Sequence, residues 1–273
     1  MRRPAGVLAT ALLAALPSEA SAQPACPRGD LPAYAHNDYE NARPLTDALA
    51  LGLRGTEADV FLVGDSLRVS HDRRRARGRG TLDALYLEPL AALVARCGAL
   101  TADGRPFLLA VEIKERSRPA YDALLRSLAR HRALFSPTAG GGAAPVDVVL
   151  VGWHPPAPEM GPDAGLPSLQ HRLRRPDDAA AAAGERVGLL SLDYGKTMGR
   201  RWTSDAGRRR WLAVLRAAKR DAPGVLVRVH NVPADARLYA ALLDAGVDLI
   251  GTKQPAATRR ILSGMTARAS SRP

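Results

Sequence analysis

The segment AHNDYENARPLTDALALGLRGTEADVFLVGDSLRVSHD, residues 35–72, decides the fold. An expected strand over 33–36 runs into it, a helical pattern follows over 44–51, and a second expected strand covers 56–62. Polar residues stand at the end of the first strand and within the second. A strand, a helix and a strand in this order predict a βαβ unit with two parallel strands.

Outward from this segment, the same alternation continues to the end of the chain. Continuous apolar runs such as VDVVLVG (146–152) are typical of strands buried on both faces of a parallel sheet. The stretch 167–171 has the weakest strand pattern, and seven strands remain without it. The expected strands are 33–36, 56–62, 107–113, 146–152, 167–171, 187–192, 225–229 and 248–251.

Helical patterns lie between these strands. Residues 81–96 carry leucines at helical spacing, and Thr81 is a suitable N-cap for them. Pro44 and Pro255 suit positions in a first helical turn. The expected helices are 44–51, 81–96, 121–131, 206–220, 235–245 and 255–262.

Strict alternation of strands and helices predicts an α/β fold with a parallel sheet and right-handed crossovers. Seven or eight such units in roughly 250 residues favour a TIM (β/α)8-type barrel over a doubly wound open sheet. Neither a G-x-G-x-x-G nor a G-x-x-x-x-G-K-[ST] loop follows the first strand, which argues against the open sheet. We therefore expect one barrel domain over residues 23–273.

Residues 1–22 have the parts of a secretory signal peptide. Arg2 and Arg3 form a basic start, residues 6–16 are apolar but too few to span a bilayer, and Ala20-Ser21-Ala22 is a suitable cleavage site. A retained N-terminal anchor is the alternative. We expect export to the periplasm or the extracellular space, with the mature chain starting at Gln23.

The two cysteines, Cys26 and Cys97, are compatible with one disulfide in an oxidising compartment. Such a bond would tie the start of the mature chain to the end of an early helix. Two separate thiols are the other alternative, and the sequence leaves both open.

The chain has 273 residues, of which 46% are hydrophobic, so a globular fold is expected. Its net charge of +12 comes mostly from arginine, and an arginine-favouring, GC-rich genome explains this excess better than a nucleic-acid partner. The densest run, Arg73–Arg79, has no interleaved aromatic residues, which single-strand binding would require. A basic surface raises the local concentration of anionic substrates. We expect a monomer that binds no nucleic acid.

Three carboxylates fall within buried strands. Glu57 and Asp59 are two residues apart, so both side chains point to one face of their strand, and Glu112 lies in the apolar run LLAVEIK. A buried carboxylate is costly unless it is paired or binds a cation. Oxygen ligands suit Ca²⁺ or Mg²⁺, so we expect one such ion here. Salt bridges to Arg54 or Lys114 are the alternative.

Two histidines accompany these carboxylates. His36 ends the first strand and His71 follows a short hairpin with a turn at Gly64-Asp65. One imidazole can accept a proton from an attacking hydroxyl while the other donates one to a leaving oxygen. The metal and Lys114 would neutralise charge on a phosphoryl group. The other histidines receive a structural interpretation by default, although His154 and His230 each follow a strand and could reach the barrel mouth.

Together these motifs resemble the PLC-like phosphodiesterase superfamily, which includes glycerophosphodiester phosphodiesterases and phosphatidylinositol-specific phospholipases C. The resemblance is closest to the group of altered inheritance of mitochondria protein 6. Segments of this chain that resemble that group are HNDY (36–39), RGTLDALYLEPL (79–90), AVEIK (110–114) and GVDLIGTKQ (246–254). The resemblance implies a distorted TIM barrel and a phosphoric diester hydrolase.

The resemblance also implies roles for single residues. His36 and His71 match the catalytic pair, and Lys114 matches a residue near the substrate phosphate. In that family a hydroxyl of the substrate attacks its own phosphorus, a cyclic phosphate forms as the alcohol leaves, and water can then open the ring. The positions that match metal ligands are Glu57, Asp59, Glu112 and Asn37.

Two segments depart from the family pattern. Gly152-Trp153-His154-Pro155 stands where relatives often have Gly-Asn-x-Pro, and VRVHNVP (227–233) stands where they often have an aromatic residue. Both would lie where substrate binds, so Trp153, His154 and His230 are candidate substrate-binding residues.

We therefore expect an exported, metal-dependent phosphodiesterase for a glycerophosphodiester or a phospholipid-like substrate. The alternatives are a lyase that stops at the cyclic phosphate and a non-catalytic protein that binds phosphate headgroups. The loop Arg73–Arg79 is expected to contact an anionic substrate or membrane surface.

Overall fold

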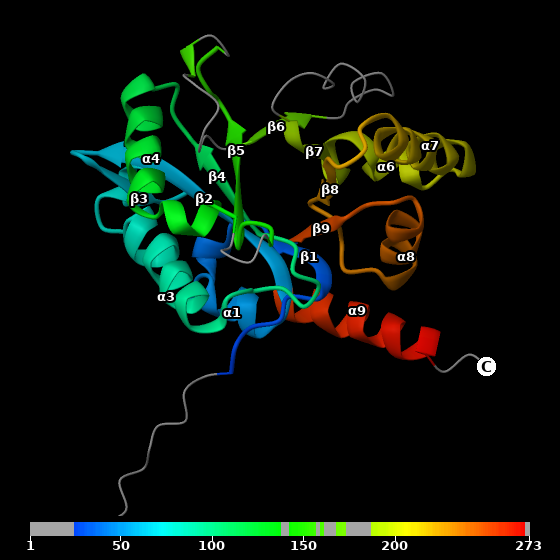
Figure 1. Ribbon diagram of the computed structural model, residues 1–273. Coiled ribbons are helices and arrows are strands. Elements are labelled where there is room, and N and C mark those ends of the chain that lie inside the picture. Colours follow the sequence, from blue (N-terminus) through cyan, green and yellow to red (C-terminus); the bar gives the residue numbers. More distant parts are fainter. Residues whose placement is uncertain (1–24, 138–141, 157–158, 161–167, 173–186, 271–273) are drawn as a thin grey trace, which may run out of the picture.

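The computed structural model describes residues 25–137, 142–156, 159–160, 168–172 and 187–270. Eight parallel strands form a closed barrel, because β1 is hydrogen-bonded both to β9 and to β2 (Figure 1). This closure confirms the predicted barrel and excludes the open sheet. The strands, in chain order and without the hairpin strand β3, are β1 (Leu31–Ala35), β2 (Leu53–Val63), β4 (Phe107–Ile113), β5 (Val146–Gly152), β6 (Ser168–Arg172), β7 (Val187–Asp193), β8 (Leu226–His230) and β9 (Leu249–Thr252).

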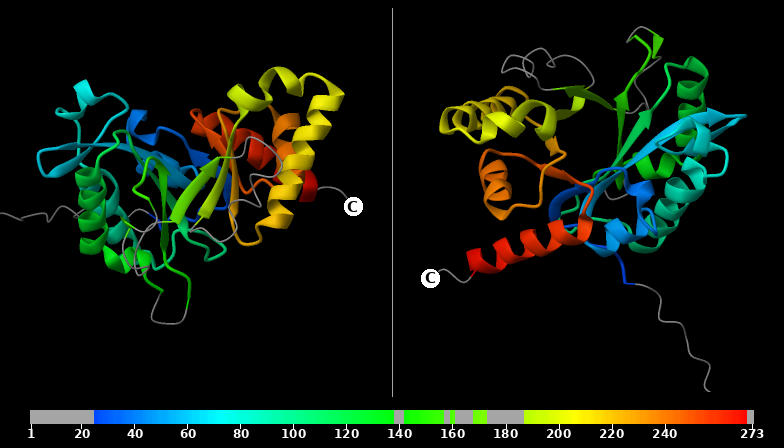
Figure 2. Two further views of the ribbon diagram at one scale, coloured as in Figure 1. Left: turned by 90° about the horizontal axis from the view of Figure 1, so that it is seen from above. Right: turned by 180° about the vertical axis from the view of Figure 1, so that it is seen from behind.

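Helices cover the outside of the barrel in two groups, which Figures 1 and 2 show on opposite sides. The first group follows β1, β2 and β4 and comprises α1 (Thr46–Ala50), α3 (Glu88–Cys97) and α4 (Arg118–Arg130). The second follows β7, β8 and β9 and comprises α6 (Gly199–Trp202), α7 (Asp205–Asp221), α8 (Ala236–Asp244) and α9 (Pro255–Ser270). A short helix, α2 (Arg73–Ala76), lies after the hairpin.

The hairpin of β2 with the antiparallel strand β3 (Ser66–Val69) brings the chain back to the carboxyl end of the barrel. Its turn contains Gly64, whose φ of 60° favours glycine. Beyond β3, the amide of Ser70 donates to the carbonyl of Asp59 at 2.9 Å. This bond places the next residue, His71, beside the acidic face of β2.

The predicted strands are each found within three residues of the expected bounds, and three of the helix predictions need correction. The helix predicted at 44–51 begins only at Thr46, because Leu45 has a φ of 61° and gives its amide to Asp38. Pro44 therefore precedes the helix. Helix α4 begins before the predicted residue 121, because Ser117 caps it by accepting from the amide of Ala120. Helix α9 starts at Pro255 as predicted but extends past 262 to Ser270.

Thr81 caps the next helical segment as predicted, since its Oγ1 accepts from the amide of Ala84 at 3.1 Å. The first turns, Asp83–Leu87, are π-helical before α3 begins. A π-turn carries one extra residue, which the regular spacing of leucines did not indicate.

The core has two outer layers and an inner one. The outer layers lie between the strands and the two groups of helices. The lower interior of the barrel is filled by apolar residues such as Leu108, Val149 and Leu189. At Gly55 a side chain would meet the Cβ of Leu108 at 2.8 Å, so glycine is needed for this close approach. Polar residues occupy the upper interior, at the carboxyl ends of the strands, and the site lies there.

Cys26 and Cys97 form a disulfide, so the structure selects this alternative over two separate thiols. The bond joins the first described residues to the last residue of α3 across a separation of 71 residues. The predicted signal peptide, residues 1–22, lies outside the described residues. Among those that are described, no helix is both long and apolar enough to cross a membrane.

Candidate active site at the carboxyl end of the barrel

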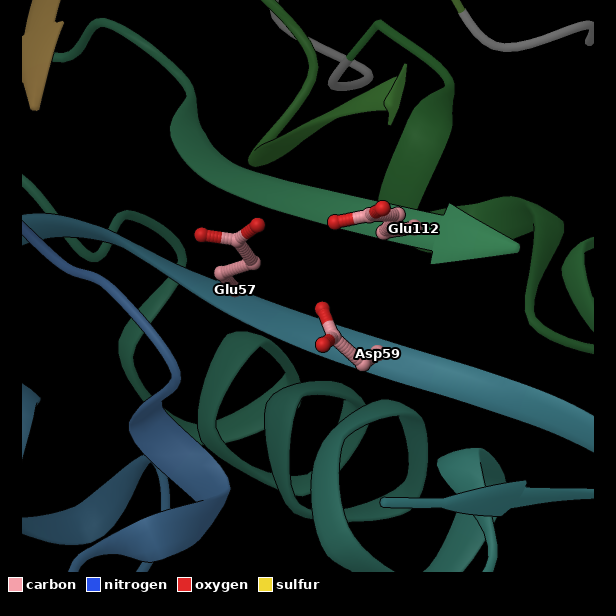
Figure 3. A group of neighbouring side chains, drawn as sticks. All are labelled: Glu57, Asp59 and Glu112. Atoms are coloured by element: carbon pink, nitrogen blue, oxygen red, sulfur yellow. The ribbon is translucent and has the colours of Figure 1, made fainter. Parts of the chain in front are cut away.

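Three carboxylates meet at the upper end of β2 and β4. Glu57 and Asp59 project from β2 and Glu112 from β4, where Asp59 and Glu112 are register partners. Figure 3 shows the three side chains directed toward a common space, and one oxygen of each lies within 4.8 Å of the others. Glu57 and Asp59 are only 3% and 1% exposed. The convergence predicted from the sequence is therefore present. Of the alternative salt-bridge partners, Lys114 pairs with Asp59 and Glu112, whereas Arg54 pairs with Asp103 instead.

The two carboxylate oxygens of Asp59 have different environments. Oδ2 accepts from the Tyr39 hydroxyl at 2.7 Å, faces Nδ1 of His71 at 2.9 Å and pairs with Nζ of Lys114 at 3.2 Å. Oδ1 is buried and has no hydrogen-bond partner among the described residues. An orphaned carboxylate oxygen beside two further carboxylates fits a hard divalent cation.

Glu57 is held from the interior of the barrel. Its Oε2 accepts from the Tyr34 hydroxyl at 2.5 Å and lies 3.6 Å from Nε2 of His36. Burial raises the pKa of Glu57, and the nearby Arg228 guanidinium and the Tyr34 hydrogen bond only partly oppose this. A bound cation would favour the charged form and remove the cost of burying it.

Lys114 pairs with the other two carboxylates. Its Nζ lies 3.2 Å from Asp59 Oδ2 and 3.2 Å from Glu112 Oε1. Burial alone would lower the pKa of Lys114, but the charges of Asp59 and Glu112 outweigh it and raise that pKa. The ammonium group is therefore charged and borders the cluster, and its position near a substrate phosphoryl group stays a prediction.

His36 follows directly after β1 and is largely buried, with a side chain 15% exposed. Its Nδ1 has no hydrogen-bond partner within the described part of the chain. Burial, followed by the charges of Arg228 and Lys253, lowers the pKa of His36 to about 4. The ring is therefore neutral at neutral pH and can accept a proton.

His71 differs from His36 in both exposure and partners. Its side chain is 59% exposed, and its Nδ1 faces Asp59 Oδ2. A carboxylate at Nδ1 orients the ring and leaves Nε2 for chemistry. The structure thus brings both predicted histidines to the acidic cluster, each beside a different carboxylate.

Asn37 comes next to His36 and adopts a left-handed backbone with a φ of 53°. Asparagine tolerates this conformation better than most residues. The residue is 4% exposed, and its neighbour in the sequence is His36 rather than a member of the carboxylate cluster. Its role as a metal ligand stays a prediction.

The HNDY motif also contains supporting residues that the sequence did not reveal. Asp38 is fully buried and accepts from the amide of Leu45 at 2.5 Å and from the Tyr86 hydroxyl at 3.2 Å. Tyr39 donates to Asp59. The motif thus links the segment after β1 to the carboxylate of Asp59. The sequence signal for this supporting role was a tyrosine between two acidic residues, Asp38-Tyr39-Glu40.

Above the carboxylates lies a polar cavity of about 470 Å³. His230 lies in it as predicted, with its Nε2 3.5 Å from Asp193 and its ring 5.4 Å from that of His36. Burial and the charge of Arg228 lower the pKa of His230. The lining residues that the sequence analysis missed include Gln170, Ser191, Asp193, Arg228 and Asn231.

Trp153 and His154 line a neighbouring cavity of about 510 Å³ rather than the main one. The two cavities share four lining residues, Glu112, Lys114, Gln170 and Arg172. Nδ1 of His154 lies 2.8 Å from the carbonyl of Pro155, so a local contact orients this ring. Both residues border the site without joining the cluster.

Residues 29–152 match the AIM6-like phosphodiesterase domain. This match confirms the resemblance inferred from the motifs, and its range includes both site histidines, the three carboxylates and Lys114. It supports a phosphodiesterase in general terms.

Two curated proteins illustrate the resemblance. An altered inheritance of mitochondria protein 6 homolog of Arthroderma benhamiae is 31% identical over 118 residues, which cover 36% of this chain and 38% of that protein. Altered inheritance of mitochondria protein 6 of Kluyveromyces lactis is 42% identical over 64 residues, or 22% of this chain and 15% of that protein. The chain thus spans well under half the length of these relatives.

Two solved structures resemble the barrel at low sequence identity. A glycerophosphodiester phosphodiesterase from Agrobacterium tumefaciens is 16% identical with a TM-score of 0.48, over 83% of this chain and 98% of that one. An Oleispira antarctica phosphodiesterase in complex with the product sn-glycerol-3-phosphate is 15% identical with a TM-score of 0.49, over 86% and 97% of the two chains.

Proposed function

We propose that this chain is a divalent-metal-dependent phosphodiesterase with His36 and His71 as its acid–base pair. The observation that carries the proposal is the convergence of three carboxylates, one with an orphaned oxygen, beside two histidines in a polar cavity. Binding alone would not require two imidazoles in such different environments.

One Ca²⁺ or Mg²⁺ would be held by Glu57, Asp59 Oδ1 and Glu112, with Asn37 as a further ligand. When bound, the ion supplies positive charge to the phosphoryl oxygens. Lys114 contributes a second positive charge from the same side of the cavity. These charges stabilise the phosphoryl group where negative charge accumulates during transfer.

His36 acts as the general base, because its lowered pKa keeps the ring neutral at neutral pH. It accepts the proton of the attacking hydroxyl at Nε2, the nitrogen nearest Glu57. Protonated His71 keeps one N–H on Asp59 through Nδ1 and donates the other, from Nε2, to the leaving oxygen. The two exchange roles when water opens a cyclic phosphate.

The substrate we propose is a glycerophosphodiester or a phospholipid-like diester. Polar lining and several cationic side chains, among them Lys114 and Lys196, support an anionic ligand with a hydroxylated group. Exposed arginines of α2 could add contact with an anionic membrane surface, since only Arg73 of this helix has an ion pair, with Glu115, among the described residues. The disulfide supports export to an oxidising compartment.

The test is turnover of a panel of glycerophosphodiesters after chelation and with Ca²⁺, Mg²⁺ or Mn²⁺ added back. The expected result is metal-dependent hydrolysis that is lost in His36→Ala and in His71→Ala while both variants keep the wild-type circular dichroism. Full activity in either variant overturns the proposal. Phosphorus NMR of the product separates a hydrolase from a lyase, because a lyase accumulates the cyclic phosphate. Saturable binding of the diesters without turnover would indicate a binding protein.

A further inference from the structure

Arg228 is a buried arginine in the upper interior of the barrel. It lies on β8, is 2% exposed and lines the polar cavity together with His36, Glu57 and Lys114. Arginine is rarely buried without full pairing, because removing a charge from water is costly. The surroundings of this guanidinium group therefore call for an explanation.

Neutral groups hold one side of the guanidinium. Nε and Nη2 donate to the hydroxyl of Ser191 at 3.1 and 2.9 Å, and Nη2 also donates to the amide oxygen of Gln170 at 2.8 Å. The ring of Tyr34 lies beneath, 4.8 Å from the guanidinium carbon. These contacts fix the orientation of the group without neutralising its charge.

The other side of the guanidinium has no hydrogen bond to any residue that the structure describes. Nη1 is buried and has no partner among the described residues. Its nearest carboxylate oxygen, Glu57 Oε2, is 3.9 Å away and already accepts from Tyr34. A cation bound by Glu57 would take most of the negative charge of that carboxylate, so Arg228 would need another anion.

We propose that Arg228 is a further catalytic residue, whose Nη1 donates a hydrogen bond to a non-bridging oxygen of the substrate's phosphoryl group. This inference rests on the proposed phosphodiesterase function. The free N–H groups are fixed in advance in a water-poor interior, where they stabilise developing charge at little reorganisation cost. Lys114 and Arg228 then bracket the phosphoryl group from β4 and from β8 across the carboxylates.

The variants Arg228→Met and Arg228→Lys test this role. Met keeps most of the volume and removes the charge, whereas Lys keeps the charge but has no planar group for Ser191 and Gln170 to hold. We expect kcat/KM to fall about 10²–10³-fold in both, the range for loss of one donor to a transition-state oxygen. The matched control is Arg54→Met on β2, at the opposite end of the barrel, which should keep wild-type activity.

A second readout does not need turnover. In calorimetry with saturating Ca²⁺ or Mg²⁺, inorganic phosphate should bind at least tenfold more weakly to Arg228→Met than to the wild type or to Arg54→Met. The metal itself should bind no more weakly to Arg228→Met, because only the positive neighbour of Glu57 has been removed. Should Arg228→Met not fold, Ser191→Ala loosens the guanidinium and should lower kcat/KM to a smaller extent.

The outcomes separate the two proposals. Absence of turnover by the wild type on every diester and metal removes the phosphodiesterase function, while the phosphate titration still decides whether Arg228 binds phosphoryl oxygens. Equal phosphate affinity in the wild type and Arg228→Met overturns the inference. So does an activity loss that saturating metal restores, because Arg228 would then act only through Glu57.

Discussion

At the scale of single residues, the chemistry depends on how Asp59 uses its two oxygens. Oδ2 is occupied by Tyr39, His71 and Lys114, and Oδ1 remains for a cation. A carboxylate fixed in this way would couple the orientation of the His71 imidazole to the proposed metal site. Loss of a group that holds a metal ligand or a catalytic histidine in place commonly lowers metal affinity or activity.

Tyr39→Phe removes the hydroxyl that holds Asp59 Oδ2 and also lies 3.3 Å from His71 Nδ1. We expect kcat to fall by about 10- to 100-fold, as is common for outer-shell partners of ligands. Tyr86→Phe is the matched control, because within the described part of the chain that hydroxyl bonds only to the structural carboxylate of Asp38. It should lower the free energy of unfolding by about 1 kcal/mol and leave kcat unchanged. Steady-state kinetics and denaturant unfolding measure the two effects, and equal kcat values in both variants would contradict the role of Tyr39.

Glu112→Gln removes one charge from the cluster and should weaken the divalent metal at least tenfold. A metal that binds only the folded chain stabilises it by about 2.7 kcal/mol at a concentration of 100 Kd. The rise in Tm on adding Ca²⁺ or Mg²⁺ to chelated protein should therefore shrink in this variant. Glu115→Gln is the control, since Glu115 pairs with Arg73 outside the cluster and its loss should preserve the full rise. A full rise in both variants would show that the metal binds elsewhere.

At the scale of elements, the strands line a barrel interior that has a polar part and an apolar part. Their upper residues form the site, and their lower residues are apolar apart from a few polar groups such as Asp147 near the start of β5. Burial raises the pKa of Asp147 to about 6, and a hydrogen bond from the amide of Val148 only partly opposes this. This carboxyl group therefore lowers the free energy of unfolding at any pH at which it is charged in the folded chain.

The sign of the pH dependence follows from this shift. The folded chain holds the Asp147 proton more tightly than the unfolded chain, so stability from this group is complete below pH 4 and is lost as the pH rises to about 6. Asp147→Asn should therefore raise the free energy of unfolding at pH 7 by up to about 3 kcal/mol and should add nothing at pH 3.5. Urea unfolding of both proteins at the two pH values measures the difference. A gain of equal size at both pH values would contradict a titrating Asp147.

At the scale of the whole molecule, the barrel was predictable because most of the parallel strands are buried on both faces and leave continuous apolar runs, with β6 as the exception. The clustered site was predictable because carboxylates within such runs are anomalous. Arg228 was not, since one arginine in VRVHNVP looks the same whether it faces water or the barrel interior. Nor did sequence spacing indicate how the oxygens of Asp59 are shared, because those partners come from three separate segments.

The disulfide acts on the whole chain rather than on the site. It closes a loop of 71 residues that contains β1, β2 and the hairpin, and such a loop corresponds to about 4 kcal/mol of lost unfolded-state entropy. Cys26→Ser/Cys97→Ser should therefore lower the free energy of unfolding by about this amount while kcat of the folded protein stays at the wild-type value. Dithiothreitol should destabilise the wild type to a similar degree and leave the double variant unaffected. If the reductant shifted the double variant as well, its effect would not come from this bond, and the disulfide would no longer support export to an oxidising compartment.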